Sequence, residues 1–298
     1  LYLFEEMFKL LALGAVGVQA VVVPTIEIEA GVHFPMIGLG TWQYNDTQAQ
    51  AAVTAALNMG YTMIDTANVY GNQVGIGAAL KASSRSRSSY FITTKINGGL
   101  NFDDATTALN QNLQQLGVDY VDLVLTHFPA SWEGQGGKAM RQAGWKALEA
   151  FKKAGKTKSI GVSHYCKSHM QDILEINTTA IALNQVEFHI GMIPWGVNAT
   201  DYMEYDRSIG VTYMSFSTLC GPCGTSELVD GPLVTGIGAK YGKTGAQVSL
   251  KWAVQQGIPV VPKSSDPKHL AENIDLFGGW QLSDDDMKVL NSQKSPPP

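Results

Sequence analysis

Residues 61–67 read Tyr-Thr-Met-Ile-Asp-Thr-Ala, and residues 121–129 read Val-Asp-Leu-Val-Leu-Thr-His-Phe-Pro. In each stretch a hydrophobic run typical of a buried strand ends in a residue that can hold or transfer a proton, Asp65 in the first and His127 in the second. The same pattern occurs at residues 90–95, Tyr-Phe-Ile-Thr-Thr-Lys, which end in Lys95. In a parallel barrel the C-terminal ends of the strands build the active face. The pattern therefore predicts a barrel with its reactive side chains at one end.

Strand-like and helix-like segments alternate along the chain. The helical segments carry apolar residues three and four positions apart and end at glycines such as Gly60 and Gly117. Right-handed crossovers between the strands predict an α/β fold, a (β/α)8 TIM barrel. Residues 26–29 and 32–34 flank Ala30-Gly31 and predict a β-hairpin that caps the barrel bottom. The eight predicted strands cover residues 36–39, 61–65, 90–95, 120–126, 157–162, 182–187, 211–216 and 258–262.

Composition agrees with one large domain. The chain has 298 residues, of which 45% are hydrophobic and 31 are glycine, as suits a large α/β domain. No linker-like stretch divides the body, so we expect an N-terminal extension over residues 1–25 and a single barrel domain over residues 26–298. The net charge of −5, without a basic stripe, argues against a nucleic-acid partner. We expect a monomer without a bound metal or a membrane partner.

Tyr70, in the Val-Tyr-Gly-Asn stretch at residues 69–72, completes a proton-transfer set. A tyrosine with a pKa near ~10 is a slow acid at neutral pH. Lys95 beside it would lower that pKa, Asp65 would hold the lysine, and His127 would orient a carbonyl group or relay the proton. Lowering the pKa of Tyr70 from ~10 to ~7 requires roughly 4 kcal/mol of phenolate stabilisation. The set favours carbonyl reduction or alcohol oxidation.

The order and spacing of these motifs resemble the aldo-keto reductase family. The resemblance runs over roughly residues 26–291 and implies NADPH-dependent reduction of a small aldehyde or ketone, with hydride from the nicotinamide and a proton from Tyr70. We expect the C-terminus to lack the long substrate loop of many relatives, as in members that act on small aldehydes and keto-sugars. The matching blocks are Gly38-Leu39-Gly40-Thr41-Trp42, Ile64-Asp65-Thr66-Ala67, Val69-Tyr70-Gly71-Asn72, Thr93-Thr94-Lys95, Thr126-His127, Gly161-Val162-Ser163-His164-Tyr165, Asn184-Gln185-Val186-Glu187-Phe188-His189 and Val261-Pro262-Lys263-Ser264.

The resemblance also implies the cofactor residues. Ser163, His164 and Gln185 would face the nicotinamide carboxamide, and Phe216 would stack on its ring. This chain departs from the family at two of these positions, because His164 replaces the usual asparagine and Phe216 the usual tyrosine. The remaining residues matched to the cofactor site are Gly40, Thr41, Trp42, Ser217, Leu219, Lys263, Ser264, His269, Glu272 and Asn273.

The adenosine end of that site decides which cofactor is expected. Lys263 and Ser264 match residues that hold the 2′-phosphate, and Glu272 and Asn273 match residues that contact adenine. NADPH is therefore expected over NADH. His269 stands where an arginine is usual and lacks its fixed charge and fork of donors, so the use of NADH stays open.

Aromatic side chains are expected to form the substrate pocket. Trp42, Asn97, Phe128 and Trp132 match wall positions of the family, while Tyr44 and Trp195 are assigned from nearby loops.

Two other functions remain open. The chain would be a cofactor-sensing binding protein, like relatives that act as ion-channel subunits, or an aldolase-type barrel in which Lys95 forms a Schiff base.

Two further segments have alternative interpretations. Residues 7–20, from Met7 to Ala20, resemble a secretory signal peptide, whereas the usual cytoplasmic location of the family favours an extension lying on the barrel. The apolar run at residues 10–18 is too short to span a bilayer. Residues 220–223, Cys-Gly-Pro-Cys, spell a thioredoxin-type motif outside the βαβ context such a motif requires, so inert thiols, a local disulfide and a redox role all stay open.

Overall fold

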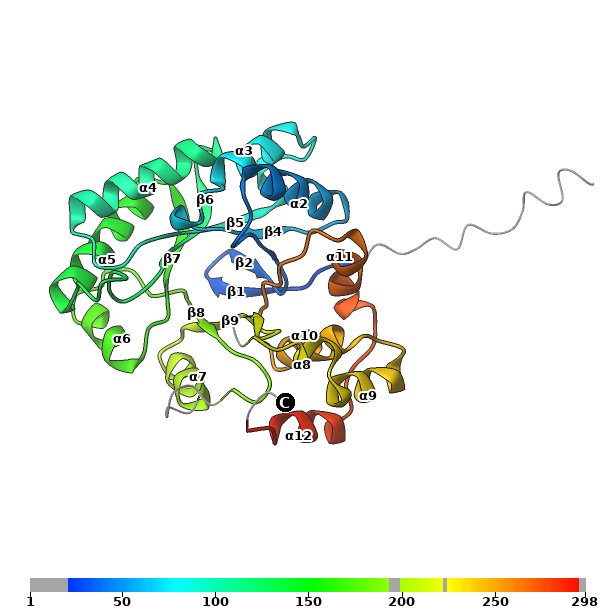
Figure 1. Cartoon of the computed structure of the whole chain (residues 1–298). Helices are drawn as coiled ribbons and strands as arrows, with labels where there is room; N and C mark the ends of the chain where they lie inside the picture. The colour runs from blue at the N-terminus through cyan, green and yellow to red at the C-terminus, as the bar shows by residue number, and fades with distance from the viewer. Residues whose placement is uncertain (1–20, 193–198, 222–223, 295–298) are drawn as a thin grey trace, which may run out of the picture.

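A barrel of parallel strands forms the centre of the protein. The structure, a computed structural model, describes residues 21–192, 199–221 and 224–294. Within these residues, seven strands pair in sequence order, each parallel to the next, and Figure 1 looks along the barrel they form. They are β3 (Leu39–Gly40), β4 (Met63–Asp65), β5 (Phe91–Ile96), β6 (Val121–Thr126), β7 (Thr157–Ser163), β8 (Leu183–Glu187) and β9 (Thr212–Phe216).

The barrel closes around Val260, which bridges both Ile37 and Ser215, and the carbonyls of Pro259 and Pro262 accept further backbone hydrogen bonds from Ser215 and Gly40. The TIM-barrel prediction is confirmed, but the predicted eighth strand at residues 258–262 is reduced to this bridge. Pro259 and Pro262 flank Val260 and lack the N–H groups that a strand ladder needs. The backbone N–H of Gly38 donates to the Val260 carbonyl at 3.0 Å, and Val260 N–H donates to the Met36 carbonyl at 3.1 Å. The predicted first strand shortens with it, to β3.

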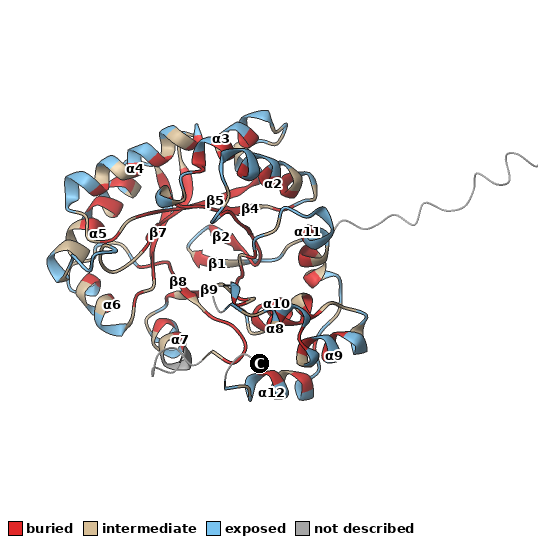
Figure 2. Cartoon of the chain, in the orientation of Figure 1, coloured by how far each residue is buried: buried red, intermediate tan, exposed pale blue. Residues whose placement is uncertain are grey.

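Helices surround the sheet and turn their apolar faces inward, as the burial colours of Figure 2 show. Side-chain caps fix where several of them begin; Asn45 and Gln48 form a capping box at the start of the first one. At Gly117 the chain takes the left-handed conformation that ends the helix before β6. The helices are α2 (Asp46–Asn58), α3 (Gln73–Ala82), α4 (Phe102–Leu116), α5 (Lys138–Lys153), α6 (Lys167–Leu174), α7 (Ala199–Ser208), α8 (Glu227–Asp230), α9 (Pro232–Tyr241), α10 (Gly245–Gln255), α11 (Pro267–Ile274) and α12 (Asp284–Asn291), with the 3₁₀ turns η1 (Asn68–Tyr70), η2 (Arg87–Ser89) and η4 (Asp275–Phe277).

The predicted hairpin is present. Strands β1 (Thr25–Glu29) and β2 (Val32–Pro35) pair antiparallel and lie across the barrel in Figure 1. Phe34 is fully buried, and its ring meets the ring of Phe91 edge-on with the centroids 5.1 Å apart. The hairpin therefore caps the barrel interior at the N-terminal ends of the strands, which we call the bottom; the opposite end is the active face.

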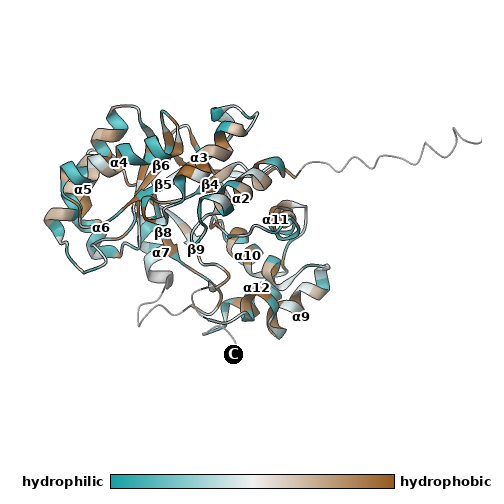
Figure 3. Cartoon of the chain, turned by 45° about the horizontal axis from the view of Figure 1, so that its top comes forward, coloured by the Kyte–Doolittle hydropathy of each residue, from teal (hydrophilic) through white to brown (hydrophobic). Residues whose placement is uncertain are grey.

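Two apolar cores result from this arrangement. The larger lies between the strands and the surrounding helices, and the smaller fills the barrel above the hairpin. Hydrophobic and hydrophilic colours both appear among the central strands of Figure 3, and every residue of β5 and β6 is buried. The members of the inner core are Ile28, Val32, Phe34, Met63, Phe91, Leu123, Leu125, Ala182, Leu183 and Met214.

Several predictions concern residues outside the described ranges. They include the signal-like stretch at residues 7–20, Trp195 and Cys223. The division at residues 25 and 26, the monomeric state and the compartment stay predictions. In the described part of the chain, no helix is both long and apolar enough to cross a membrane.

Candidate active site

The four residues of the proton-transfer set meet at the active face. Asp65 ends β4, Lys95 is the penultimate residue of β5, and His127 directly follows β6, so three neighbouring strands supply three of the side chains. Tyr70 ends the η1 turn that follows β4. Each side chain therefore stands where a strand gives way to a loop, as the sequence pattern predicts.

Lys95 is the centre of this set and is fully buried. Its Nζ lies 2.5 Å from Oδ1 of Asp65 and 3.1 Å from the backbone carbonyl of Thr66, and it donates to Tyr70 Oη at 3.3 Å. An ammonium group has three N–H donors, and these three acceptors match them. The predicted Asp65–Lys95 ion pair and the Lys95–Tyr70 contact are both present.

The pKa of Tyr70 in the structure shifts in the opposite direction from the one that the sequence analysis predicted. Burial raises the pKa of Tyr70, the charge of Lys95 lowers it, and the charge of Asp65 raises it again, so that the net shift is upward and not downward. The expected lowering toward ~7 neglected burial and the neutralisation of Lys95 by Asp65. For Lys95, burial would lower the pKa, but Asp65 and Tyr70 outweigh it and the pKa is raised. The lysine is thus charged and the tyrosine is a neutral phenol at pH 7.

His127 is a neutral imidazole in this setting. Burial, and next the charge of Lys95, lower the pKa of His127 to about 2. Its ring meets the ring of Tyr70 edge-on, with the centroids 5.6 Å apart. The Nδ1 atom of His127 is buried and has no hydrogen-bond partner among the described residues. A neutral imidazole carries one N–H, so this arrangement leaves Nε2 as the nitrogen free to donate.

Ser163, His164 and Gln185 join this set from β7 and β8. Ser163 Oγ donates to the Gln185 backbone carbonyl at 2.7 Å, and Gln185 Nε2 donates to Oδ2 of Asp65 at 2.8 Å. Asp65 therefore binds Lys95 with one oxygen and Gln185 with the other. The contact from Gln185 to the ion pair was not predicted, because sequence resemblance assigned Gln185 to the cofactor alone.

His164 occupies an unusual backbone conformation, with φ at 60°, where asparagine is enriched and histidine is also tolerated. Its Nδ1 lies 2.9 Å from Ser163 Oγ and 3.0 Å from the His127 carbonyl. Because the hydroxyl hydrogen of Ser163 is directed to Gln185, both neighbours act as acceptors, and Nδ1 carries the proton. Burial, opposed by the bond to the His127 carbonyl, lowers the pKa of His164 to about 4. His164 thus holds the backbone of His127 and is neutral at pH 7.

Aromatic rings form one wall of the site. The Phe128 ring contacts the rings of both His127 and His164, at centroid distances of 4.6 and 4.3 Å, and Trp132 packs on Phe128 at 4.5 Å. The centroid of the Phe216 ring lies 4.8 Å from that of His164. Trp132 is 73% exposed, so the wall is open to solvent at its outer edge. Such a wall suits a small molecule with an apolar or planar part.

The other predicted substrate residues lie around the same strand ends. Trp42 is 49% exposed, and the Tyr44 ring lies under Lys263 Nζ at 5.3 Å. Asn97 directly follows β5, and its Oδ1 is buried without a partner among the described residues. Thr41 is fully buried and donates its hydroxyl to the Asp65 carbonyl at 2.8 Å. Thr41 therefore supports Asp65 in addition to its predicted cofactor role.

The predicted phosphate end lies beside the barrel seam. Lys263 is exposed, and its Nζ donates to Gln43 Oε1 at 2.8 Å without an ion pair to any described carboxylate. Ser264 follows it, and Asp266 caps α11. On α11, His269 is exposed, Glu272 lies 3.7 Å from Lys268 through their charged atoms, and Asn273 is buried.

These residues fit a nicotinamide cofactor with a 2′-phosphate. Among the described residues the partners of Lys263 are neutral, namely Gln43 Oε1 and the Tyr44 ring, so its charge is available to an anion. The unpartnered Oδ1 of Asn97 and Nδ1 of His127 show that the mouth of the barrel holds polar groups without protein partners in the described part of the chain. Gly40 permits the close approach there of Val261, whose carbonyl would lie 2.7 Å from an added Cβ. Ser217 takes a positive φ of 51° in the loop after β9, where Leu219 is half-buried.

Sequence reasoning missed several residues that hold the site together. Asn72 is fully buried and donates to the carbonyls of Thr41 and Tyr44 at 2.7 and 3.0 Å. Its position two residues after Tyr70 was the available signal. Gln43 and the buried amides behind β5 carried no such signal, because their partners are distant in the sequence.

Two of the three cysteines, Cys166 and Cys220, lie in the described part of the chain. Cys220 is buried, with Sγ 3.2 Å from Nε2 of His189, and Cys223 lies outside the described residues. Cys166 is free and precedes α6 as its N-cap residue. The described residues contain no group of three or more His, Cys, Asp or Glu side chains that could hold a metal ion.

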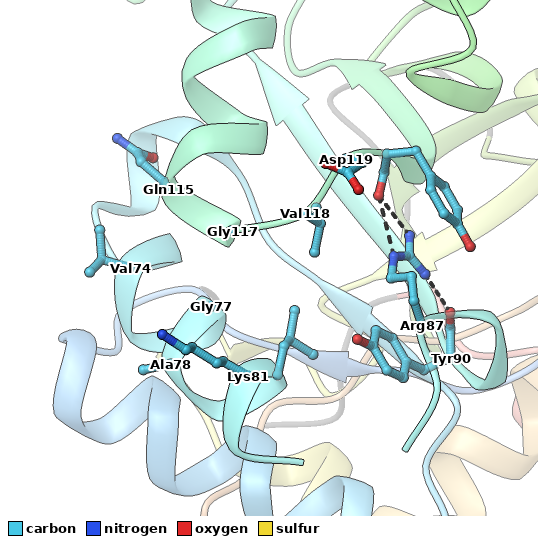
Figure 4. Close-up of a pocket in the computed structure, with 12 residues that line it drawn as sticks. Val74, Gly77, Ala78, Lys81, Arg87, Tyr90, Gln115, Gly117, Val118 and Asp119 are labelled. Carbon is cyan, nitrogen blue, oxygen red and sulfur yellow. Dashed lines mark hydrogen bonds between the residues drawn. The ribbon is translucent and has the colours of Figure 1, made fainter. Parts of the chain in front are cut away.

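A groove of about 480 Å³ lies on the outside of the barrel between α3 and α4 (Figure 4). Tyr90 and Tyr120, which precede β5 and β6, line it, so it opens toward the bottom and away from Lys95 and His127. Arg87 is held there by the Tyr90 and Tyr120 carbonyls and by Asp122. None of the predicted site residues lines this groove.

Comparison with known proteins gives consistent matches. The model of the aldo/keto reductase family matches residues 36–294. An aldo-keto reductase of Mycobacterium sp. (strain MCS) is 34% identical over 274 residues, which cover 92% of each chain. A glyoxal reductase of Bacillus subtilis (strain 168) is 33% identical over 270 residues, covering 90% of this chain and 92% of that protein. A solved aldo-keto reductase complexed with NADPH superposes with a TM-score of 0.82 at 29% identity, over 93% of this chain and 90% of that chain.

Proposed function

The chain belongs to the aldo/keto reductase family, and we propose that it reduces aldehydes with NADPH, using Tyr70 as the proton donor. The family makes it an NAD(P)H-dependent oxidoreductase that acts on small carbonyl compounds. The observation that carries this proposal is the contact of Tyr70 Oη with the buried Lys95 ammonium at 3.3 Å, itself held by Asp65 at 2.5 Å.

The geometry supports Tyr70 as an acid that acts only when negative charge develops beside it. Its raised pKa keeps the phenol protonated at pH 7. As a carbonyl oxygen gains charge, the phenolic proton can pass to it, and the adjacent ammonium stabilises the phenolate that remains. Asp65 keeps Lys95 charged, and Gln185 orients Asp65 through the 2.8 Å bond.

His127 would orient the substrate. A histidine with a pKa near 2 is neutral at any ordinary pH, so it donates one hydrogen bond and is not a strong acid. Its free Nε2 would donate to the carbonyl oxygen and place that oxygen near Tyr70. The His164 imidazole supports this by holding the His127 carbonyl at 3.0 Å.

The cofactor would supply the hydride. Ser163, His164 and Gln185 would bind its carboxamide, and Phe216 would pack on its ring. Gly40, Thr41, Trp42, Ser217 and Leu219 would line its path, with Glu272 and Asn273 near the adenine. Lys263 and Ser264 would hold the 2′-phosphate, which favours NADPH, while the exposed His269 lacks the fork of donors that an arginine would offer there.

The open aromatic wall favours compact substrates. Phe128 and Trp132 pack against each other with their centroids 4.5 Å apart and offer apolar surface beside the proton donor. The similarity to a glyoxal reductase supports a small aldehyde as substrate. Trp42, Tyr44 and Asn97 would complete the pocket. All four reactive residues come from one chain, so a monomer suffices.

The test is NADPH oxidation with a panel of small aldehydes, run with the wild-type protein and with Tyr70→Phe. We expect the variant to lose reduction by a factor on the order of 10²–10⁴, since general acid catalysis contributes about that much, with little change in NADPH affinity. Near-normal turnover in the variant would exclude Tyr70 as the donor. Tight NADPH binding without wild-type turnover would instead indicate the cofactor-sensing binding protein.

An aldolase-type reaction is not favoured. A Schiff-base lysine needs a lowered pKa, whereas the pKa of Lys95 is raised by its acidic partner. Borohydride trapping with a carbonyl substrate would detect such an intermediate at Lys95.

A further inference from the structure

A cluster of buried amide side chains lies directly behind the reactive set, between β5 and the helices α3 and α4. Asn112, on α4, and Gln73, the first residue of α3, are each 1% exposed. Neither residue is among those assigned to the proposed reaction, yet buried amides must satisfy several donors and acceptors at once. The hydrogen-bond partners of Asn112 and Gln73 therefore show which parts of the chain these side chains hold in place.

Asn112 contacts three separate elements through one amide group. Its Oδ1 accepts from Asn68 Nδ2 at 3.0 Å and from Gln73 Nε2 at 2.8 Å, and its Nδ2 donates to the backbone carbonyl of Lys95 at 3.3 Å. Asn68 begins the η1 turn that ends at Tyr70. One side chain thus ties the backbone of Lys95 to the turn that carries Tyr70.

Gln73 strengthens the same connection. It accepts from Thr94 Oγ1 at 2.7 Å, one residue before Lys95, and donates to Gln115 Oε1 at 2.8 Å. Thr94 is fully buried. The two amides together fix β5, α3, α4 and η1 relative to one another at the level of the reactive side chains.

We propose that Asn112 is a positioning residue that sets the distance between Lys95 Nζ and Tyr70 Oη. This inference rests on the proposed function, because that distance matters through proton donation by Tyr70. The Lys95–Tyr70 contact, at 3.3 Å, is the longest of the three that the ammonium makes. A small displacement of η1 would therefore break this bond first. Misplacement of a catalytic group by about 1 Å can cost on the order of a hundredfold in rate.

The cluster also reaches the outer surface. Gln115, which accepts from Gln73, lines the groove between α3 and α4 and is labelled in Figure 4. The inner partner Asn112 has no such exposure. A substitution of Asn112 therefore acts on the site from within, without altering the exposed side chains of the groove.

Asn112→Leu tests the proposal, because leucine keeps the size of the side chain and removes its three hydrogen bonds. We expect kcat to fall about tenfold to a hundredfold with the KM for NADPH within about twofold of wild type. We also expect the pH midpoint for loss of reduction to rise, because Lys95 would stabilise the Tyr70 phenolate less. A merely structural role would lower the melting temperature and leave the pH midpoint unchanged.

Asn110→Leu is the matched control. Asn110 is an exposed asparagine on the same helix, bonded to Thr106 and Lys156. It should retain wild-type kcat and pH midpoint. Asn68→Ala, which removes only the bond to η1, guards against misfolding of the leucine variant and should show the same changes to a smaller degree.

Crystal structures of the wild-type protein, of Asn112→Leu and of Asn68→Ala separate this proposal from the proposed function. We expect the Lys95 Nζ to Tyr70 Oη distance to lengthen beyond hydrogen-bonding range in Asn112→Leu. An unchanged distance, or an unchanged kcat and pH midpoint in an active protein, would overturn the role of Asn112. If the wild type shows no turnover, the proposed function fails and the crystallographic distance alone decides the positioning role.

Discussion

Met63 and Phe91 lie at the bottom of the barrel interior, whereas Asp65 and Lys95 lie at its active face on the same two strands. The members of each pair are an even number of residues apart, so their side chains project to the same side of the strand. The bottom is an apolar core closed by the hairpin, and the active face is a buried ion pair with hydrogen-bonded neighbours. Along β4 and β5, a side chain of the apolar core and a side chain of the ion pair are therefore only two to four positions apart.

The two ends differ in what they contribute to stability. Burying a large apolar side chain stabilises a fold by roughly 1.5–3 kcal/mol. A buried ion pair contributes little, because removing both charges from water costs about as much as their attraction returns. Asp65 and Lys95 are both nearly inaccessible to solvent, so the pair fits the proposed reaction better than it fits a role in stability.

Phe91→Ala is the change with the largest expected effect on this comparison. Phe91 is 7% exposed and packs on Phe34, so the free energy of unfolding should fall by about 3–5 kcal/mol, the usual cost of such a truncation. At temperatures where the variant remains folded, its kcat should stay close to that of the wild type. Chemical denaturation and NADPH oxidation measure the two quantities.

Phe102→Ala is the control for that change. Phe102 is 42% exposed at the start of α4, so its truncation should alter stability by less than about 1 kcal/mol. A collapse of kcat in folded Phe91→Ala would contradict the separation of the two ends.

Lys263→Met sharpens the comparison at the active face by separating recognition from chemistry. Loss of a charged partner for a 2′-phosphate should raise the KM for NADPH about tenfold or more, while the KM for NADH and kcat change little. Steady-state kinetics with both cofactors measure this. The exposed Lys153 at the end of α5 provides the control, Lys153→Met, and equal effects of Lys263→Met on both cofactors would remove the proposed phosphate role.

Asp206→Asn has the smallest expected effect and concerns a buried acid outside the barrel. Asp206, on α7, accepts from Asn184 at 2.9 Å, and burial raises its pKa from 3.8 to about 7. The folded state therefore holds a proton that the unfolded state has released, and stability is lost as the pH rises from about 4 through 7. The variant should melt a few degrees higher than wild type at pH 8, with the gain shrinking toward pH 4.

Thermal melts across this range measure the effect, with the exposed Asp119→Asn as control. A pH-independent difference between Asp206→Asn and wild type would contradict the raised pKa. A large loss of kcat would show that buried polar groups outside the active face also serve the reaction.

The barrel and the reactive set were accessible from sequence because they depend on local patterns. Strand-like runs such as residues 121–126 end at the polar residue that the structure places on the active face, and the even spacing of Met63 and Asp65 sets their common direction. The hairpin followed from Ala30-Gly31 between two short strands. Each of these features can be recognised from a short, continuous stretch of the sequence.

The parts that sequence did not predict depend on contacts between distant residues. The upward pKa shift of Tyr70 comes from burial, which becomes known only when the strands pack. Likewise, the Asn112 contacts to Asn68 and Lys95 join segments 44 and 17 residues apart. The prediction of a full eighth strand was wrong because Pro259 and Pro262 interrupt the segment. The two prolines were visible in the sequence, but the prediction gave more weight to the hydrophobic run around Val260.

The seam around Val260 affects how the chain assembles. Tyr70, Lys95 and His127 come from adjacent β-strand units in the first half of the chain, whereas the seam joins Val260 to Ile37, which are 260 − 37 = 223 positions apart. Loop-closure entropy grows with the length of chain enclosed, so this contact costs the most conformational freedom of any in the barrel ladder. During synthesis on the ribosome, all of the proton-transfer residues are therefore made long before Pro259, Val260 and Pro262, which close the barrel.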